Sequence, residues 1–226
     1  MIVALDFPVL DKALALTDEL GGAVSFYKVG MELFYGAGGE AVRRLRAAGK
    51  EIFLDLKLYD IPNTVAHSVK VLTRLGATML NVHASGGPAM MRAAARACSE
   101  AADELGRPRP KLIAVTVVTS MDEAEWSRLN YAAPIARQVV HLAKLAQEVG
   151  LDGVVASPRE AAAIRASCGG NFLIVTPGVR PAGAERGDQS RMATPAGALK
   201  AGASHLVVGR PITAAPDPRA AVAAIL

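Results

Sequence analysis

The sequence predicts an α/β protein folded as a (β/α)8 TIM barrel, a single domain spanning residues 1–226. Short apolar runs typical of strands alternate with alanine-rich amphipathic runs typical of helices along the whole chain. The alternation gives eight strand–helix units in 226 residues, which is the number and approximate length of this barrel. No glycine-rich fingerprint follows the first predicted strand, which disfavours the competing doubly wound open sheet.

The predicted strands are short and almost entirely apolar, as expected of parallel strands that are buried on both faces. We expect them at Ile2–Asp6, Ser25–Val29, Glu51–Lys57, Thr78–His83, Leu112–Val118, Gly153–Ala156, Phe172–Thr176 and Ser204–Val208.

The predicted helices show apolar residues at helical spacing, and several have proline in the first turn or glycine after the last. We expect them at Val9–Glu19, Gly39–Ala48, Thr64–Leu75, Pro88–Glu104, Pro134–Val149, Pro158–Ala166, Pro195–Ala201 and Pro218–Ile225. Two longer connections stand out, Ser120–Ala133 and Pro177–Met192. Long loops in a compact barrel are usually lids or binding loops, and both follow strands on the face where barrel enzymes build their sites.

Composition excludes several functional classes. The formal charge is +4, from 25 basic and 21 acidic residues, without a basic block or interleaved aromatic residues. Nucleic-acid binding is therefore not expected. No apolar run reaches the ~18 residues of a membrane span, and the chain starts directly in a strand without the features of a signal peptide. The two cysteines, Cys98 and Cys168, fit no metal or redox motif, so we expect a cytoplasmic protein without a disulfide.

A cluster of charges follows the third predicted strand. Asp55 and Lys57 are two residues apart, so in a regular strand their side chains project from the same face. Asp60 lies beyond the strand, in a turn before Pro62. Charges at the end of a buried strand are costly unless they pair or take part in chemistry. At this point the cluster is either a structural ion pair or a catalytic site.

Further polar residues follow other predicted strands, and a barrel brings the ends of its strands together. Asp6 ends the first strand and Lys28 the second, while Thr119 follows the fifth. Alternating carboxylates and ammonium groups around one rim favour a catalytic set over a purely structural ladder of charges.

The end of the eighth strand is the second informative stretch. Gly209 permits close approach of a ligand to the backbone, and the guanidinium of Arg210 suits a phosphate. Loops after strands seven and eight commonly bind phosphate in this barrel. Arg180 and Gln189, in the long loop before the eighth strand, could close over the same group.

These motifs together resemble those of the orotidine 5′-phosphate decarboxylase family, in its short bacterial form. The segment Asp55-Leu56-Lys57-Leu58-Tyr59-Asp60-Ile61-Pro62-Asn63-Thr64 is similar to the family signature, although Tyr59 stands where many bacterial members have histidine. Matching segments occur in order along the whole chain, namely Ala4-Leu5-Asp6, Tyr27-Lys28-Val29-Gly30, Asn81-Val82-His83-Ala84, Val115 to Ser120, Thr176 to Pro181, Gly187-Asp188-Gln189 and Val208-Gly209-Arg210.

The resemblance implies decarboxylation of orotidine 5′-monophosphate to UMP, the last step of pyrimidine nucleotide synthesis, without cofactor or metal. It implies that Lys57 delivers the proton to C6, that Asp55 lies beside the substrate carboxylate, and that Lys28 belongs to the charged network. It also implies a homodimer in which Asp60, Ile61 and Thr64 reach the partner's site. The implied substrate-binding residues are Asp6 and Lys28 for the ribose, Thr119 and Ser120 for the pyrimidine, and Pro177, Arg180, Gln189, Gly209 and Arg210 around the phosphate.

Two alternatives remain at the level of sequence. The Asp-x-Lys-x-x-Asp core also occurs in Mg2+-dependent sugar-phosphate enzymes of the same barrel group, such as hexulose-phosphate synthase. However, those relatives usually continue with small residues instead of Ile-Pro-Asn-Thr. The other alternative is a phosphate-binding barrel without turnover, whose mark would be loss of Lys57 or an aspartate.

Among the histidines, His83 ends a strand but has no second ligand at metal-binding spacing, so we expect it to be packed beneath the site.

Overall fold

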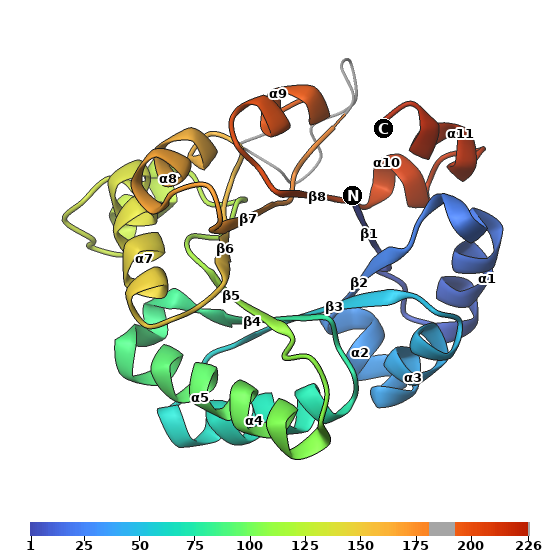
Figure 1. Ribbon diagram of the computed structural model, residues 1–226. Helices are drawn as coiled ribbons and strands as arrows, with labels where there is room; N and C mark the ends of the chain where they lie inside the picture. Colours follow the sequence, from blue (N-terminus) through green and yellow to red (C-terminus); the bar gives the residue numbers. More distant parts are fainter. Residues whose placement is uncertain (181–192, 226) are drawn as a thin grey trace.

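Eight parallel strands close into a barrel in the order of the sequence, with β8 beside β1. The computed structural model describes residues 1–180 and 193–225, and Figure 1 shows the strands as an inner ring surrounded by helices. The strands are β1 (Ile2–Ala4), β2 (Phe26–Gly30), β3 (Glu51–Leu58), β4 (Met79–His83), β5 (Lys111–Val115), β6 (Gly153–Val155), β7 (Leu173–Thr176) and β8 (His205–Val208). The predicted fold class is confirmed.

The α-helices lie outside the barrel (Figure 1). They are α1 (Leu10–Leu20), α2 (Met31–Ala37), α3 (Gly39–Ala47), α4 (Pro62–Arg74), α5 (Gly87–Leu105), α6 (Glu123–Arg128), α7 (Ile135–Glu148), α8 (Ala161–Cys168), α9 (Pro195–Lys200), α10 (Arg210–Thr213) and α11 (Pro218–Ala223). The short helices α2, α6 and α10 were not predicted. Each follows a strand or lies in an insertion, where seven or fewer residues give too little periodicity to read.

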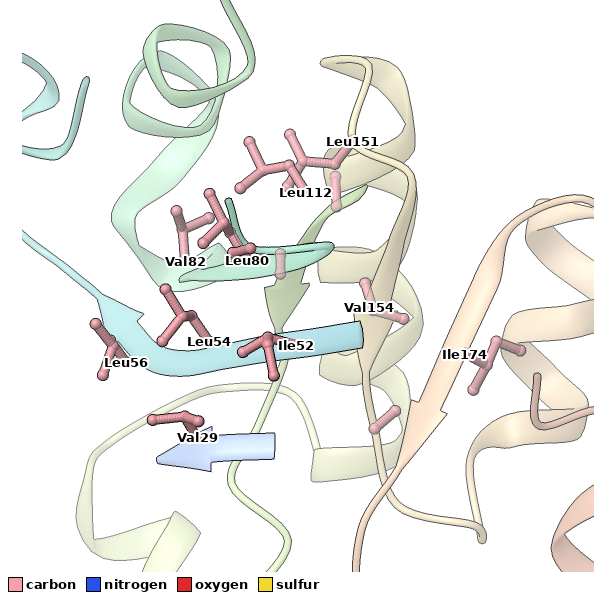
Figure 2. Close-up of a cluster of buried hydrophobic side chains, with 14 of the residues drawn as sticks. Val29, Ile52, Leu54, Leu56, Leu80, Val82, Leu112, Leu151, Val154 and Ile174 are labelled. Carbon is pink, nitrogen blue, oxygen red and sulfur yellow. The ribbon is translucent and has the colours of Figure 1, made fainter. Parts of the chain in front are cut away.

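The main hydrophobic core fills the space between the strands and the helices. Figure 2 shows part of this layer, with side chains from β2 to β7 that include Leu54, Leu80 and Val154. The residues that alternate with these along each strand point into the barrel. At its base, a smaller apolar cluster contains Phe26, Phe53 and Met79. The barrel is therefore packed at the amino-terminal ends of its strands, and the polar residues collect at the other end.

The boundaries of several elements differ from the prediction. β5 ends at Val115 instead of Val118, and the backbone N–H and the hydroxyl of Thr116 both donate to the carbonyl of Val155. The two cysteines are buried free thiols, as predicted. Across the described residues, none of the helices combines the length and the apolar character needed to cross a bilayer.

Candidate active site

A cavity of about 660 Å³ opens at the carboxyl ends of the strands. Ten of the predicted site residues line it, and they come from six different strand ends. They are Asp6, Lys28, Asp55, Lys57, Thr119, Ser120, Pro177, Arg180, Gly209 and Arg210. Its apolar wall includes Val115, Val155 and Val207, whose side chains continue the packed interior of the barrel. The topology thus brings residues more than 200 positions apart in the sequence into one site.

Four charged side chains form a continuous chain in this cavity. Lys28 Nζ lies 2.8 Å from Asp6 Oδ1 and 3.5 Å from Asp55 Oδ2. Lys57 Nζ lies 2.8 Å from Asp55 Oδ1. Carboxylate and ammonium groups alternate along the chain, so each buried charge has an opposite neighbour. Asp6 is the more exposed end, whereas Lys28 and Asp55 are buried.

The carboxylate of Asp55 is held ionised by its neighbours. Burial alone would raise its pKa, but the charges of Lys28 and Lys57 and hydrogen bonds from Lys57 and Asn81 bring the pKa below its ordinary value. A fixed negative charge therefore lies beside the Lys57 ammonium at neutral pH. That combination can act on a substrate in which negative charge develops during the reaction.

Lys57 does not lie in a regular strand, contrary to the simple strand model used for the sequence. Its φ angle is 52°, in the left-handed region, and the pairing of β3 with β4 shifts register between Leu54 and Leu58. Three residues of β3 therefore lie opposite the single residue Asn81 of β4. The prediction that the side chains of Asp55 and Lys57 project in the same direction still holds, since the two meet in one cavity.

Gly30 makes room for the Asp6–Lys28 pair. A Cβ atom at this position would lie 2.8 Å from Lys28 Nζ and 3.0 Å from Asp6 Oδ1. Gly30 also pairs with Asp55 in the ladder between β2 and β3. The absence of a side chain here is what allows the two charges to meet beside Asp55.

Five further lining residues follow the neighbouring strands β7 and β8, namely Pro177, Gly178, Arg180, Gly209 and Arg210. Gly209 directly precedes α10, which Arg210 begins. Arg180 and Arg210 thus add two guanidinium groups to a lining that also contains the charged chain. Gln189, also predicted to bind the phosphate, lies outside the described residues.

The residues predicted to serve the partner's site do not line the cavity of their own chain. Asp60, Ile61 and Thr64 are exposed, and they lie where β3 gives way to α4. Asp60 Oδ1 accepts a hydrogen bond from the backbone N–H of Ile61 at 2.6 Å. These three predicted site residues therefore lie together at the start of α4, apart from the charged chain that lines the cavity.

The aromatic residues near the site are engaged in packing. Trp126 is buried, stacks on Tyr131 with ring centroids 4.1 Å apart, and donates from Nε1 to the carbonyl of Ala133. This pair anchors the insertion after β5. The His83 ring lies 5.5 Å from that of Tyr59. Burial lowers the pKa of His83, as does the nearby Lys57.

Within residues 1–180 and 193–225, His, Cys, Asp and Glu side chains form no group of three suited to a metal ion. Asp6 and Asp55 instead contact lysine ammonium groups.

The profile of the Orotidine 5'-phosphate decarboxylase / HUMPS family matches residues 1–225. The chain belongs to this family. It is 57% identical over 226 residues to orotidine 5'-phosphate decarboxylase from Moorella thermoacetica, covering 100% of this chain and 90% of the relative. It is 54% identical to the protein of that name from Halorhodospira halophila, covering 100% of this chain and 93% of the relative. The crystal structure of orotidine 5'-phosphate decarboxylase from Lactobacillus acidophilus superposes with a TM-score of 0.88 at 43% identity, covering 100% of this chain and 96% of that one.

In this member of the Orotidine 5'-phosphate decarboxylase / HUMPS family, the structure adds two residues to which sequence reasoning gave no role. Gly30 and Asn81 both occur in segments that match the family pattern, yet neither carries a charge. A signal existed for Asn81, because it is a polar residue in the middle of an apolar strand. No comparable signal marks Gly30, whose importance depends on a close approach that only the folded chain reveals.

Proposed function

We propose that this chain decarboxylates orotidine 5′-monophosphate to UMP and CO2, in one catalytic domain spanning residues 1–226. The observation that carries the proposal is the chain of charges from Asp6 through Lys28 and Asp55 to Lys57, in one cavity with two arginines. Family membership supports the same reaction.

The reaction breaks the bond between C6 and the carboxylate carbon, and the electron pair stays on C6 as CO2 leaves. The resulting carbanion lies in the plane of the ring and has no adjacent group that can delocalise it. Fixed charges that favour this transition state over the bound substrate can therefore supply the catalysis. The Lys57 ammonium stabilises the developing charge and then transfers a proton to C6, after which its amine regains a proton from solvent. Asp55 contributes by holding that ammonium in place.

The other lining residues divide according to their place in the cavity. Asp6 and Lys28 bind the ribose hydroxyl groups, and Thr119 and Ser120 contact the pyrimidine. Support for this comes from Asp6 and Lys28 being held together at 2.8 Å, beside Asp55.

Arg180 and Arg210, with the backbone at Pro177 and Gly209, bind the 5′-phosphate, and Gln189 belongs to the same group. Arginine suits a phosphate because its planar guanidinium offers two parallel N–H donors. The phosphate is remote from the bond that breaks, so its binding energy serves to position the ring for reaction.

The active form is a homodimer in which Asp60, Ile61 and Thr64 enter the cavity of the partner. These residues are exposed beside the site yet line none of their own cavity, which supports a role across an interface. A two-fold dimer would form two such sites from one contact.

The two buried free thiols, Cys98 and Cys168, support a cytoplasmic location.

The deciding experiment follows the loss of orotidine 5′-monophosphate absorbance with purified protein in the presence of EDTA. We expect turnover that survives the chelator, with UMP and CO2 formed in equal amounts. Orotidine without its phosphate should react far more slowly, since the binding energy of the phosphate is lost. Absence of turnover with the phosphorylated substrate would overturn the proposal, and turnover lost to EDTA and restored by Mg2+ would overturn the metal-free mechanism.

A further inference from the structure

Asn81 lies in the middle of β4, buried beneath the charged chain. Its Oδ1 accepts a hydrogen bond from the backbone N–H of Lys57 at 2.8 Å, and its Nδ2 donates to Asp55 Oδ1 at 2.7 Å. A backbone N–H can only donate, so the amide oxygen must face Lys57 and the amide nitrogen must face Asp55. One side chain therefore contacts both residues of the central ion pair, in a single orientation.

The contact with Lys57 falls where β3 leaves regular geometry. Asn81 is the one residue of β4 between the partners of Leu54 and Leu58, opposite three residues of β3. Lys57 has a φ angle of 52°, a left-handed conformation that is unfavourable for an L-residue with a Cβ atom. Such a conformation persists only where the surroundings hold it. Asn81 supplies an acceptor for the N–H of that same residue.

The contact with Asp55 orients the carboxylate. Oδ1 of Asp55 receives two donors, Nδ2 of Asn81 and Nζ of Lys57, while Oδ2 faces Lys28 at 3.5 Å. Because Asn81 is neutral, it fixes the carboxylate without adding a charge to the chain. Asn81 is only 1% exposed and does not line the cavity. Any effect on a bound substrate must therefore pass through Asp55 and Lys57.

We propose that Asn81 is a positioning residue for the decarboxylation, which holds the left-handed backbone at Lys57 and the Asp55 carboxylate in their reactive arrangement. This inference rests on the proposed function. Displacement of a reacting group by about 1 Å can lower a rate about 100-fold even when binding is little changed. Loss of Asn81 should therefore act on kcat more than on ligand binding.

Two variants remove either the contact with Asp55 alone or both contacts. Asn81→Asp has nearly the same shape and keeps the acceptor for Lys57, but it presents a carboxylate to Asp55. Asn81→Leu has a similar volume and removes both contacts. Asn171→Asp is the matched control, because Asn171 is exposed before β7, at the end of the barrel away from the cavity.

We expect kcat to fall about 30- to 100-fold in both Asn81 variants, with the dissociation constant for UMP changed by less than about fivefold. The control should retain the kcat of the unmodified chain. Rates are expressed per UMP-binding site, so that a smaller folded fraction does not lower them.

Two results would overturn the proposal. One is an unchanged rate per UMP-binding site in both variants. The other is loss of UMP binding in both, which would make Asn81 a residue of the fold alone. The unmodified chain is assayed in parallel with orotidine 5′-monophosphate. If it shows no turnover, the proposed function fails, and if it is active while the variants keep its rate, only the role of Asn81 fails.

Discussion

The ammonium of Lys57 lies 2.8 Å from the carboxylate of Asp55, although the backbone at Lys57 has left the regular strand. The bulge in β3 inserts two residues, an even number, relative to β4. An even insertion keeps the residues that follow the bulge on their original faces, so Leu58 still packs against the main core. Lys57 itself lies inside the bulge, where its backbone N–H donates to Asn81 and its ammonium donates to Asp55.

Replacing Lys57 with alanine should abolish decarboxylation while leaving UMP binding measurable. The ammonium both stabilises the carbanion and supplies the proton, so we expect kcat to fall by at least about 10⁴-fold. The arginines proposed to bind the phosphate, Arg180 and Arg210, are unchanged, so calorimetry should still detect UMP. Lys12→Ala, at an exposed position of α1, is the control and should keep full activity. Turnover by Lys57→Ala near the unmodified rate would refute the assigned role.

Gly30→Ala should lower activity with little loss of stability. The added Cβ would lie 2.8 Å from Lys28 Nζ, which is the mobile end of a flexible side chain and can shift at small cost to the fold. That shift breaks the spacing to Asp6 and Asp55, so we expect kcat/KM to drop about 10-fold or more. Gly22→Ala is the matched control, because a Cβ there meets nothing within 4 Å. Equal activity of the two variants, at equal melting temperature, would contradict this prediction.

The free energy of unfolding should decrease as the pH falls from 7.5 to 5.5, in part through His205. Burial lowers the pKa of this histidine, and the N-terminal ammonium lowers it further while Glu51 opposes the shift. Below about pH 6.5, the His205 imidazole is therefore protonated in the unfolded chain, whereas in the folded chain it stays neutral until a lower pH. The stabilisation from His205 is complete above that pH and is lost as the pH falls towards the folded pKa. The slope from one histidine can reach about 1.4 kcal/mol per pH unit.

Urea unfolding at fixed protein concentration measures this slope. His205→Gln cannot titrate and should flatten the pH dependence, while His67→Gln, at an exposed position of α4, should leave it as in the unmodified chain. His83, whose pKa is also lowered by burial, should account for part of the remaining slope. If His205→Gln shows the same pH dependence as the unmodified chain, His205 does not contribute.

The barrel could be predicted from sequence because its signal is repeated. Eight apolar strands with polar residues at one end indicate both the fold and the face that carries the site. Errors of a few residues at each strand boundary change neither conclusion. The prediction for β5 was three residues too long, yet Thr119 still lies in the cavity. Charges such as Asp6 and Lys28 are visible in the sequence because they interrupt or end apolar runs.

What could not be predicted depends on contacts between distant residues. The left-handed φ of Lys57 is unusual for a residue with a Cβ atom, and its hydrogen-bond partner Asn81 lies 24 positions away. The role of Gly30 depends on the position of the Lys28 side chain. No local sequence pattern indicates the conformation of Lys57 or the role of Gly30, so both become visible only in the folded barrel.

Mixing two inactive variants tests whether each site is shared between chains. In a heterodimer of Lys57→Ala and Asp60→Ala chains, one site would combine an intact Lys57 with an intact Asp60 from the partner, and the other site would lack both. Random exchange makes about half of the dimers mixed, so about one quarter of all sites should recover activity.

Lys57→Ala mixed with Asp55→Ala is the matched control. Both residues serve the cavity of their own chain, so no combination of these chains restores a site. Exchange is verified with differently tagged chains. If exchange is complete and the Asp60→Ala mixture stays as inactive as this control, Asp60 acts within its own chain. Recovery only in the Asp60→Ala mixture would mean that the turn after β3 completes the neighbouring site, because no other arrangement pairs the two intact residues.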